Sequence, residues 1–173
     1  MKLALPVAAS LLLCLSATAV LAEAITARVA HVVDGDTLDV LLQGKRLRVR
    51  LVDIDAPEQK QPDGLRSRQS LIQICAGEIA TLESRGRDRN GRMLAHVVCD
   101  TTDANAEQVR RGMAWVFKRY AAPDSPLYRV QNEARAARRG LWSEAAPIAP
   151  WQWRRLGHSE RAERRLSDTT PEH

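Results

Sequence analysis

The fold is decided by residues 25–53, which read ITARVAHVVDGDTLDVLLQGKRLRVRLVD. Apolar residues alternate with other residues in three short runs, and the segments 34–36 and 43–45 separate those runs. Alternation with a period of two is typical of strands with one buried face, and the Asp and Gly residues of the separators are typical of turns. The stretch therefore predicts a three-stranded meander, with arginines on one face of its third strand and apolar side chains on the other.

The rest of the chain adds helices and two further strands. The expected segments are a helix over 65–76, strands over 79–84 and 93–98, a short helix within 103–112 and a helix that begins at Ser125-Pro126. Gly77 suits the end of the first helix, and Pro126 suits the first position of the last one. We therefore predict a mainly β protein with helices, of the α+β class, built as a five-stranded Greek-key barrel flanked by three helices.

Both ends of the chain differ from the part between them. Residues 1–22 are apolar apart from Lys2 and end in Val20-Leu21-Ala22, which is typical of a secretory signal peptide cleaved after Ala22. An uncleaved membrane anchor is the alternative, because the apolar run just reaches the length that spans a bilayer. Residues 157–173 are polar and charged, and we expect a disordered tail there. The folded domain would then be residues 23–156 of a periplasmic or secreted protein.

Removal of the signal peptide would leave two cysteines, Cys75 and Cys99. Such a pair can form a disulfide in an oxidising compartment, and two buried free thiols are the other interpretation. The four histidines are scattered without the spacing of metal ligands. We therefore expect neither a zinc site nor a histidine-based nuclease.

The charge of the chain is compatible with a polyanionic partner. The net charge is +5 at pH 7, and arginine far outnumbers lysine, which occurs only at positions 2, 45, 60 and 118. Guanidinium groups bind phosphate through two parallel hydrogen bonds, which an ammonium group cannot do. The composition is thus consistent with nucleic acid as a partner.

Two aspartates stand where strands are expected to begin and end. Asp36 opens the second predicted strand, and Asp55 closes the third, just before Ala56-Pro57. Each could be a simple turn residue, as we expect Asp34 to be. Adjacent strands can nevertheless bring both carboxylates to one place, where they would form a sparse oxygen site for a hard divalent cation. A location outside the cytoplasm favours Ca²⁺ for this site.

Charged side chains that suit phosphate chemistry accompany the two aspartates. Glu58 is three residues beyond Asp55, and a carboxylate beside a cation and a phosphate could accept a proton from an attacking water. Arg50 and Arg92 could hold phosphate oxygens and balance the charge of the transition state. The neighbouring arginines of the third strand, Arg46 and Arg48, could follow a phosphate backbone without taking part in the chemistry. The set predicts a phosphodiesterase.

Taken together, these motifs resemble the thermonucleases of the staphylococcal-nuclease-like family, of the secreted bacterial type. The similarity covers residues 24–155, and the motifs stand in the family's order and spacing. They are Asp34-Gly35-Asp36-Thr37, Arg50 with Asp55-Ala56-Pro57-Glu58, Asp88-Arg89-Asn90-Gly91-Arg92, Asn105 with Val109 and Gly112-Met113-Ala114, and Gly140-Leu141-Trp142.

The resemblance implies an OB-fold barrel and a Ca²⁺-dependent endonuclease that hydrolyses DNA and RNA with little sequence specificity, leaving 3′-phosphate ends. The site residues that it implies are Asp36, Asp55 and the carbonyl oxygen of Ala56 for Ca²⁺, and Arg50, Glu58 and Arg92 for catalysis. A catalytically silent nucleic-acid-binding OB-fold module is the alternative function, which the presence of all five charged residues disfavours. The expected partners are DNA and RNA substrates; we expect a monomer without stable membrane association after signal cleavage.

Two regions depart from the family pattern. The loop over residues 58–64 is short and carries little positive charge. Where the family has stacking tyrosines, this chain has Lys118, Arg119 and Tyr120, which could bind substrate by stacking or by phosphate contacts. Trp115 and Phe117 belong to the same segment, and we expect them in the core. Trp142 matches a structural tryptophan of the family.

Overall fold

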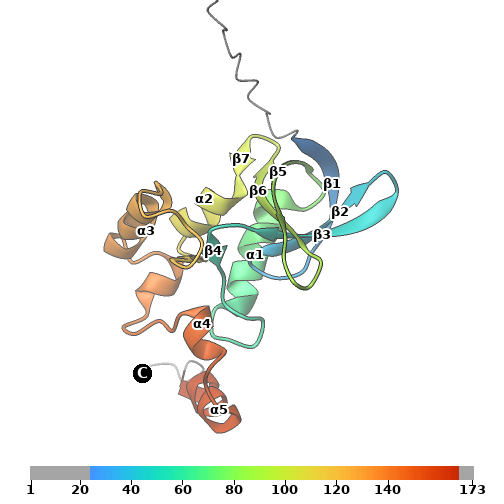
Figure 1. Ribbon diagram of the computed structural model, residues 1–173. Helices are drawn as coiled ribbons and strands as arrows, with labels where there is room; N and C mark the ends of the chain where they lie inside the picture. Colours follow the sequence, from blue (N-terminus) through green and yellow to red (C-terminus); the bar gives the residue numbers. More distant parts are fainter. Residues whose placement is uncertain (1–23, 168–173) are drawn as a thin grey trace, which may run out of the picture.

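The structure, a computed structural model, describes residues 24–167. The predicted signal peptide and its cleavage site lie outside the described residues, as do residues 168–173 of the predicted tail. The long strands gather in one half of the molecule, and helices α3, α4 and α5 lie in the other half (Figure 1). No helix within residues 24–167 is long and apolar enough to cross a membrane.

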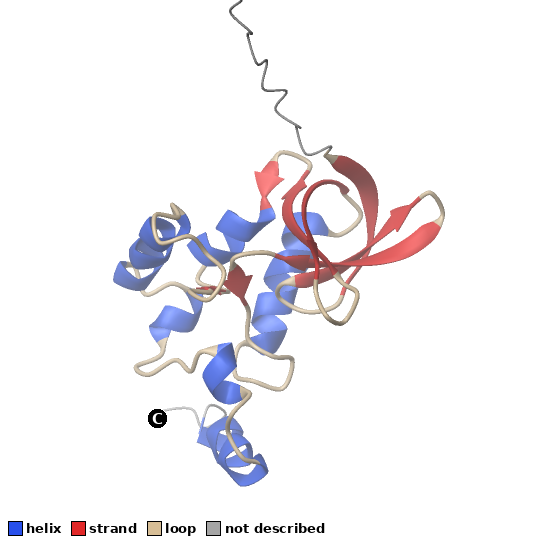
Figure 2. Cartoon of the chain, in the orientation of Figure 1, coloured by secondary structure: helices blue, strands red, loops and turns tan. Residues whose placement is uncertain are grey.

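A closed barrel of five strands forms the first half. Strand β1 pairs with β2 and β5, β2 pairs with β3, and β5 pairs with β6, all antiparallel. A parallel pairing of β3 with β6 closes the barrel, with Arg50 opposite Leu94. The barrel strands are β1 (Ile25–Val32), β2 (Thr37–Leu42), β3 (Lys45–Leu51), β5 (Ile79–Arg87) and β6 (Met93–Cys99). The predicted α+β class and OB-fold barrel are confirmed (Figure 2).

Short strands outside the barrel were not predicted. Strand β4 (Ile54–Asp55) pairs with β8 (Trp115–Val116) in a separate small sheet, and β7 (Thr102–Asp103) pairs with the end of β6. Strands of two residues give no alternating pattern, so the sequence carries no sign of them.

The three predicted helices are α1 (Gly64–Cys75), α2 (Ala104–Arg110) and α3 (Leu127–Ala136). Beyond α3 come the 3₁₀ helix η1 (Gly140–Ser143), α4 (Pro150–Trp153) and α5 (His158–Ser167). Helix α5 stands where we expected a disordered tail. Its sequence is rich in Arg and Glu, which favour helix, and the Glu160 carboxylate accepts a hydrogen bond from the amide of Gly157 at 2.7 Å, which fixes the helix start.

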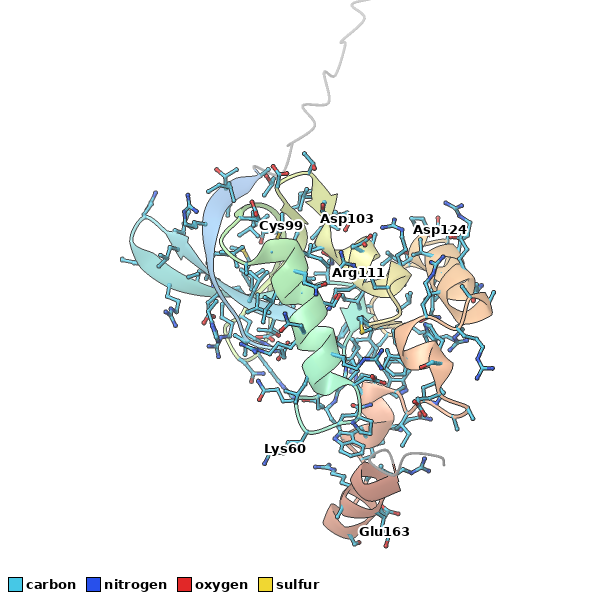
Figure 3. All side chains as sticks on the ribbon, turned by 180° about the vertical axis from the view of Figure 1, so that it is seen from behind. Lys60, Cys99, Asp103, Arg111, Asp124 and Glu163 are labelled. Carbon is cyan, nitrogen blue, oxygen red and sulfur yellow. A yellow bond between two sulfur atoms is a disulfide. The ribbon has the colours of Figure 1, made fainter. Side chains whose placement is uncertain are left out.

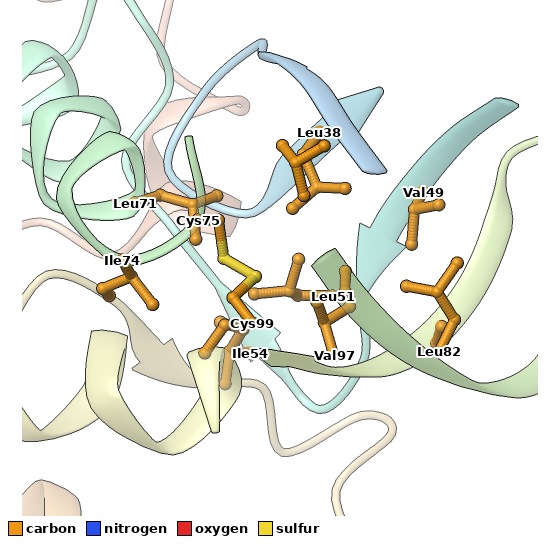
Figure 4. Close-up of a cluster of buried hydrophobic side chains, with 14 of the residues drawn as sticks. Leu38, Val49, Leu51, Ile54, Leu71, Ile74, Cys75, Leu82, Val97 and Cys99 are labelled. Carbon is orange, nitrogen blue, oxygen red and sulfur yellow. A yellow bond between two sulfur atoms is a disulfide. The ribbon is translucent and has the colours of Figure 1, made fainter. Parts of the chain in front are cut away.

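The core fills the barrel and continues under α1 (Figure 4). Leu38, Leu51 and Leu82 from the strands are buried, together with Leu71 of the helix. Cys75, the last residue of α1, forms a disulfide with Cys99 at the end of β6, 24 positions away in the sequence. The structure therefore contains the disulfide and not two free thiols. The bridge joins the helix to the barrel from inside the core.

A β-bulge changes the predicted face of the first strand. The pairing of β1 with β2 shifts register between Val29 and His31. Strict alternation would have placed His31 inside with Val29, but the extra residue turns His31 outward and buries Val32 instead.

Candidate active site

The turn before β2 is held by a buried side chain of helix α2. Gln108 Nε2 donates to the carbonyl oxygen of Gly35 at 2.6 Å and to that of Ser67 at 3.1 Å. A side chain at position 35 would collide with Ser67, so only glycine allows the turn to lie against α1. The carboxylate of Asp34 accepts a hydrogen bond from the amide of Asp36 at 3.1 Å, as expected of a turn aspartate. Asp36 is thereby fixed at the entrance of β2.

Asp55 lies on β4, which corrects its predicted place at the end of the third strand. The chain leaves β3 and turns at Asp53, whose φ of 63° is in the left-handed region that aspartate tolerates. Asn105 of α2 holds this turn, because its amide group donates to the carbonyl of Val52 at 2.8 Å. Beyond the turn, Asp55 pairs with Trp115 across the small sheet, and its side chain is only 1% exposed.

Arg50 joins the two aspartates. Its Nη1 lies 2.5 Å from Asp36 Oδ2, and its Nη2 donates to Asp55 Oδ1 at 3.0 Å. The amide of Ala56 also donates to Asp36 Oδ2, at 2.7 Å. Both carboxylates therefore face one guanidinium, although Asp55 reaches it from β4 and not from the third strand. Nη1 thus makes an ion pair with Asp36, but it has no hydrogen bond of good geometry among the described residues.

Burial and charge act against each other in this cluster. Burial raises the pKa of Asp55, and the hydrogen bonds from Arg154 and the charge of Arg50 offset only part of that shift. Burial lowers the pKa of Arg50, but the charges of Asp36 and Asp55 raise it by more, so that the net shift is upward. Burial, followed by the charge of Asp36, raises the pKa of Asp34 to about 7. A cation in addition to Arg50 would therefore be favoured beside these aspartates.

Glu58 lies at the start of the loop that leads from β4 to α1. Its amide donates to the side chain of Gln61 at 3.2 Å, and the amide group of Gln61 donates to the carbonyl of Ile148 at 2.6 Å. This buried glutamine ties the loop to the segment before α4, which Figure 1 shows beside it. Lys60, further along the loop, points away from the rest of the molecule (Figure 3), so the loop brings no lysine to the carboxylates.

Arg154, directly after α4, completes the cluster and was not predicted. Its Nη2 donates to Asp55 Oδ2 at 2.7 Å, and its Nη1 donates to Glu58 Oε1 at 2.7 Å. Arg154 and Asp55 are 99 positions apart in the sequence, and no local sequence pattern predicts such a pairing.

Arg92 stands apart from the carboxylate cluster. Its Nε donates to Asp88 Oδ2 at 2.7 Å, and the amides of Arg92 and Asn90 hold the same aspartate. Burial raises the pKa of Asp88, but these hydrogen bonds lower it by more, so the net shift is downward. Arg92 lines a hollow of about 490 Å³ with Arg46 and Arg48 of β3. The structure thus places Arg92 beside Arg46 and Arg48, paired within its own turn.

The segment after β8 presents aromatic and basic side chains on the surface. Tyr120 is 67% exposed, its ring meets the edge of Phe117, and Arg119 lies 5.8 Å from its centroid. Phe117 is half-buried and stacks on Trp151 of α4 at 5.5 Å between ring centroids. Lys118 is exposed and lines a second hollow, about 490 Å³ in volume. None of these residues contacts the carboxylate cluster among the described residues.

Two tryptophans have the structural place expected of them. Trp115 and Trp142 are buried, and their rings meet edge to face at 5.3 Å between centroids. The guanidinium of Arg135 in α3 lies 4.2 Å above the ring of Trp142. Together they join β8 to the helices of the second half.

The donors of the cluster suit a hard cation. Within residues 24–167 no three His, Cys, Asp or Glu side chains come close enough together to hold a metal ion. Asp36 and Asp55 nevertheless share one guanidinium, and a second guanidinium, that of Arg154, lies on Asp55 and Glu58. Carboxylate oxygens that attract two cationic side chains are the ligands that Ca²⁺ and Mg²⁺ prefer. The contact of Ala56 is made by its amide, so ligation by its carbonyl oxygen stays a prediction.

Comparison with known proteins agrees with this geometry. The sequence profile of the family described as Staphylococcal nuclease homologue matches residues 48–144. An "Uncharacterized endonuclease" of Escherichia coli O157:H7 is 46% identical over 136 residues, which cover 78% of this chain and 88% of that protein. A "Micrococcal nuclease" of Shigella flexneri is 40% identical over 137 residues, which cover 73% of this chain and 79% of that protein. With the barrel, the motifs and these relatives in agreement, the chain belongs to the staphylococcal nuclease homologue family.

Proposed function

We propose that this member of the nuclease family is a Ca²⁺-dependent endonuclease that hydrolyses DNA and RNA with little sequence specificity and leaves 3′-phosphate ends. The observation that carries the proposal is the buried guanidinium of Arg50 between Asp36 and Asp55. Its Nη1 is in an ion pair with Asp36 but makes no hydrogen bond of good geometry among the described residues, and a phosphate oxygen would supply one.

The residues that would hold the cation are Asp36, Asp55 and the carbonyl oxygen of Ala56. Bound there, Ca²⁺ would supply positive charge to the phosphate and lower the barrier to attack on phosphorus. Side chains of the protein perform the other steps, which are the binding of the phosphate and the transfer of the proton. Arg50 orients the scissile phosphate through two parallel hydrogen bonds, and Arg92 approaches from the neighbouring basic face after release from Asp88.

Glu58 acts as the general base. It accepts a proton from water as the water oxygen bonds to phosphorus, and the bond from phosphorus to the 5′-oxygen breaks. The 5′-oxygen leaves as an alcohol after it takes a proton from solvent, and the phosphate stays on the 3′ side. The carboxylate of Glu58 is 44% exposed, which supports this role because water can reach it.

Lys118, Arg119 and Tyr120 are proposed to bind the substrate strand beyond the reaction centre. An exposed tyrosine beside two basic side chains can stack a base and contact the phosphate backbone. Every base offers a ring face, so such binding would not depend on sequence. Arg46 and Arg48 offer further phosphate contacts along β3.

We further propose that the protein acts in the periplasm or outside the cell, as a monomer. The predicted signal peptide supports this location, and the disulfide between Cys75 and Cys99 suits an oxidising compartment.

The test is a product analysis on the purified protein, residues 23–173. Single- and double-stranded DNA and RNA of mixed sequence, labelled at the 5′ end, are incubated with Ca²⁺ or with Mg²⁺. We expect internal cleavage of all substrates with Ca²⁺ and fragments that end in 3′-phosphate. Fragments with 5′-phosphate and 3′-hydroxyl ends would show that the bond between phosphorus and the 5′-oxygen is not the one broken. Binding without cleavage would favour the catalytically silent OB-fold module.

A further inference from the structure

The side chain of Arg154 covers both oxygens of the central carboxylate. Its Nη2 lies 2.7 Å from Asp55 Oδ2, and its Nη1 lies 3.3 Å from Asp55 Oδ1. Arg50 donates to the same Oδ1 at 3.0 Å. Since the Asp55 side chain is 1% exposed, these nitrogens occupy the accessible directions around it. A divalent cation that binds Asp55 needs an oxygen that Arg154 now holds.

Arg154 also holds the proposed base. Its Nη1 donates to Glu58 Oε1 at 2.7 Å, so one guanidinium bridges Asp55 and Glu58. Three carboxylates, those of Asp36, Asp55 and Glu58, thus face the two guanidinium groups of Arg50 and Arg154. The charges of Asp55 and Glu58 outweigh the burial that lowers the pKa of Arg154, so its pKa is raised and the side chain stays a cation.

The segment that carries Arg154 is anchored, so the contact is part of the fold. Trp153 is buried, and Trp151 stacks on Phe117. The carbonyl of Arg154 accepts a hydrogen bond from Arg161 of α5 at 2.9 Å. This segment lies beyond residues 48–144, the part that matches the family profile.

We propose that Arg154 is a resident cation of the active site, which competes with the divalent cation for Asp55 and at the same time holds the base Glu58. In the metal-free protein its single positive charge is shared between Asp55 and Glu58, and Glu58 stays in an ion pair. When Arg154 leaves Asp55, its remaining contact with half-exposed Glu58 is a surface ion pair, which contributes little. Glu58 is then free to accept a proton, so metal binding and release of the base are coupled. This inference rests on the calcium site of the proposed function.

The test is calorimetric titration of Ca²⁺ into the metal-free protein and three variants. Arg154→Met keeps an unbranched apolar stem and removes the guanidinium with its charge, and Arg154→Lys keeps the charge but loses the bidentate contact with Asp55. Arg155→Met is the matched control: Arg155 is exposed, and within residues 24–167 no ion pair or hydrogen bond of its side chain is found. This control removes the same unit of positive charge next to Arg154. It therefore measures the long-range effect of that charge on Ca²⁺ binding.

We expect Arg154→Met to bind Ca²⁺ roughly ten- to a hundredfold more tightly than the wild type, within the usual range of coupling between two ligands of one site. The Ca²⁺ affinity of Arg154→Lys should fall between those of the wild type and Arg154→Met. The affinity of Arg155→Met should match that of the wild type. Equal or weaker binding by folded Arg154→Met would overturn the inference alone, because the wild type would still bind and cleave. Tighter binding without cleavage by any variant would reject the nuclease mechanism and keep the inference. Absence of Ca²⁺ binding in every variant would overturn both.

Discussion

The barrel and the C-terminal segment, residues 145–167, contribute to one cluster in different ways. The barrel half supplies Asp36 and Arg50 from neighbouring strands, and buried Gln108 and Asn105 hold the turns beside them. The C-terminal segment supplies only Arg154, which is 43% exposed and reaches the cluster from outside. The acids are thus buried beside the barrel, whereas their second cation is the half-exposed side chain of an anchored segment and can move away from them. The predictions below separate what each region contributes.

The largest effect is expected from Arg50→Lys. A lysine at position 50 can contact one of the two aspartates but cannot reach both aspartates and a phosphate at once. The substitution therefore removes the guanidinium that joins them. We expect turnover to fall by about 10³–10⁵, the range for loss of an arginine that stabilises phosphoryl transfer. Initial rates on a labelled oligonucleotide measure this. Arg48→Lys on the exposed face of the same strand is the control, and equal losses in both variants would contradict the special role of Arg50.

Glu58→Gln should affect chemistry without affecting the barrel. The amide cannot accept the proton of the attacking water, so we expect turnover to fall by about 10²–10⁴ while Ca²⁺ binding and the far-ultraviolet circular dichroism stay the same. The surface variant Glu133→Gln serves as the control. A near-normal rate in Glu58→Gln would show that this carboxylate is not the base.

Reduction of the disulfide should weaken the barrel half. The bridge between Cys75 and Cys99 ties α1 to β6, and its loss should lower the free energy of unfolding by roughly 3 kcal/mol for a loop of this length. Urea unfolding with and without a reducing agent measures the change. The Cys75→Ser/Cys99→Ser variant should be insensitive to the reducing agent, and an unchanged wild type would mean that the bridge contributes nothing.

A smaller effect of pH is expected at the barrel surface, where His96 of β6 meets Asp103 of β7. His96 Nε2 lies 3.1 Å from Asp103 Oδ2, and this hydrogen bond raises the pKa of His96 above its ordinary value of 6.5. Burial raises the pKa of Asp103, but His96 and the helix amides lower it by more, to below 3.8. A histidine whose folded pKa is raised stabilises the fold fully below pH 6.5 and loses this contribution as the pH rises through the folded value. The aspartate contribution is lost as the pH falls through its own folded value.

Comparison with His96→Gln tests this pair. The difference in stability between the wild type and the variant should be greatest between about pH 4 and pH 6.5 and should shrink towards pH 8. Denaturant unfolding across that range measures it, with exposed His31→Gln as the control. A difference that is constant from pH 5 to pH 8 would contradict the assignment.

Local patterns predicted most of the barrel half. Alternation gave the strands and the faces of Arg46, Arg48 and Arg50, because one buried side forces a period of two. The pattern was wrong where the backbone departs from regular strand. A bulge turned His31 outward, and the left-handed turn at Asp53 moved Asp55 to a strand of its own.

Long-range pairing accounts for what the sequence did not predict. Arg154 meets Asp55 only because the chain folds back across 99 positions, and nothing in its neighbourhood distinguishes it from Arg155. The pairing of Arg92 with Asp88 in the same turn was not predicted either, and the contact of Arg92 with the phosphate stays a prediction. Charge and spacing identify candidate side chains, and only the fold decides which of them meet.

The most direct test of the central claim is cleavage under chelation. Purified protein is given a labelled oligonucleotide in Ca²⁺, in excess chelator, and in chelator followed by restored Ca²⁺, with circular dichroism recorded in each state. If Asp36, Asp55 and Arg50 form a calcium-dependent nuclease site, cleavage should stop in chelator, return with Ca²⁺, and leave the fold unchanged throughout. Undiminished cleavage by folded protein in excess chelator would contradict it.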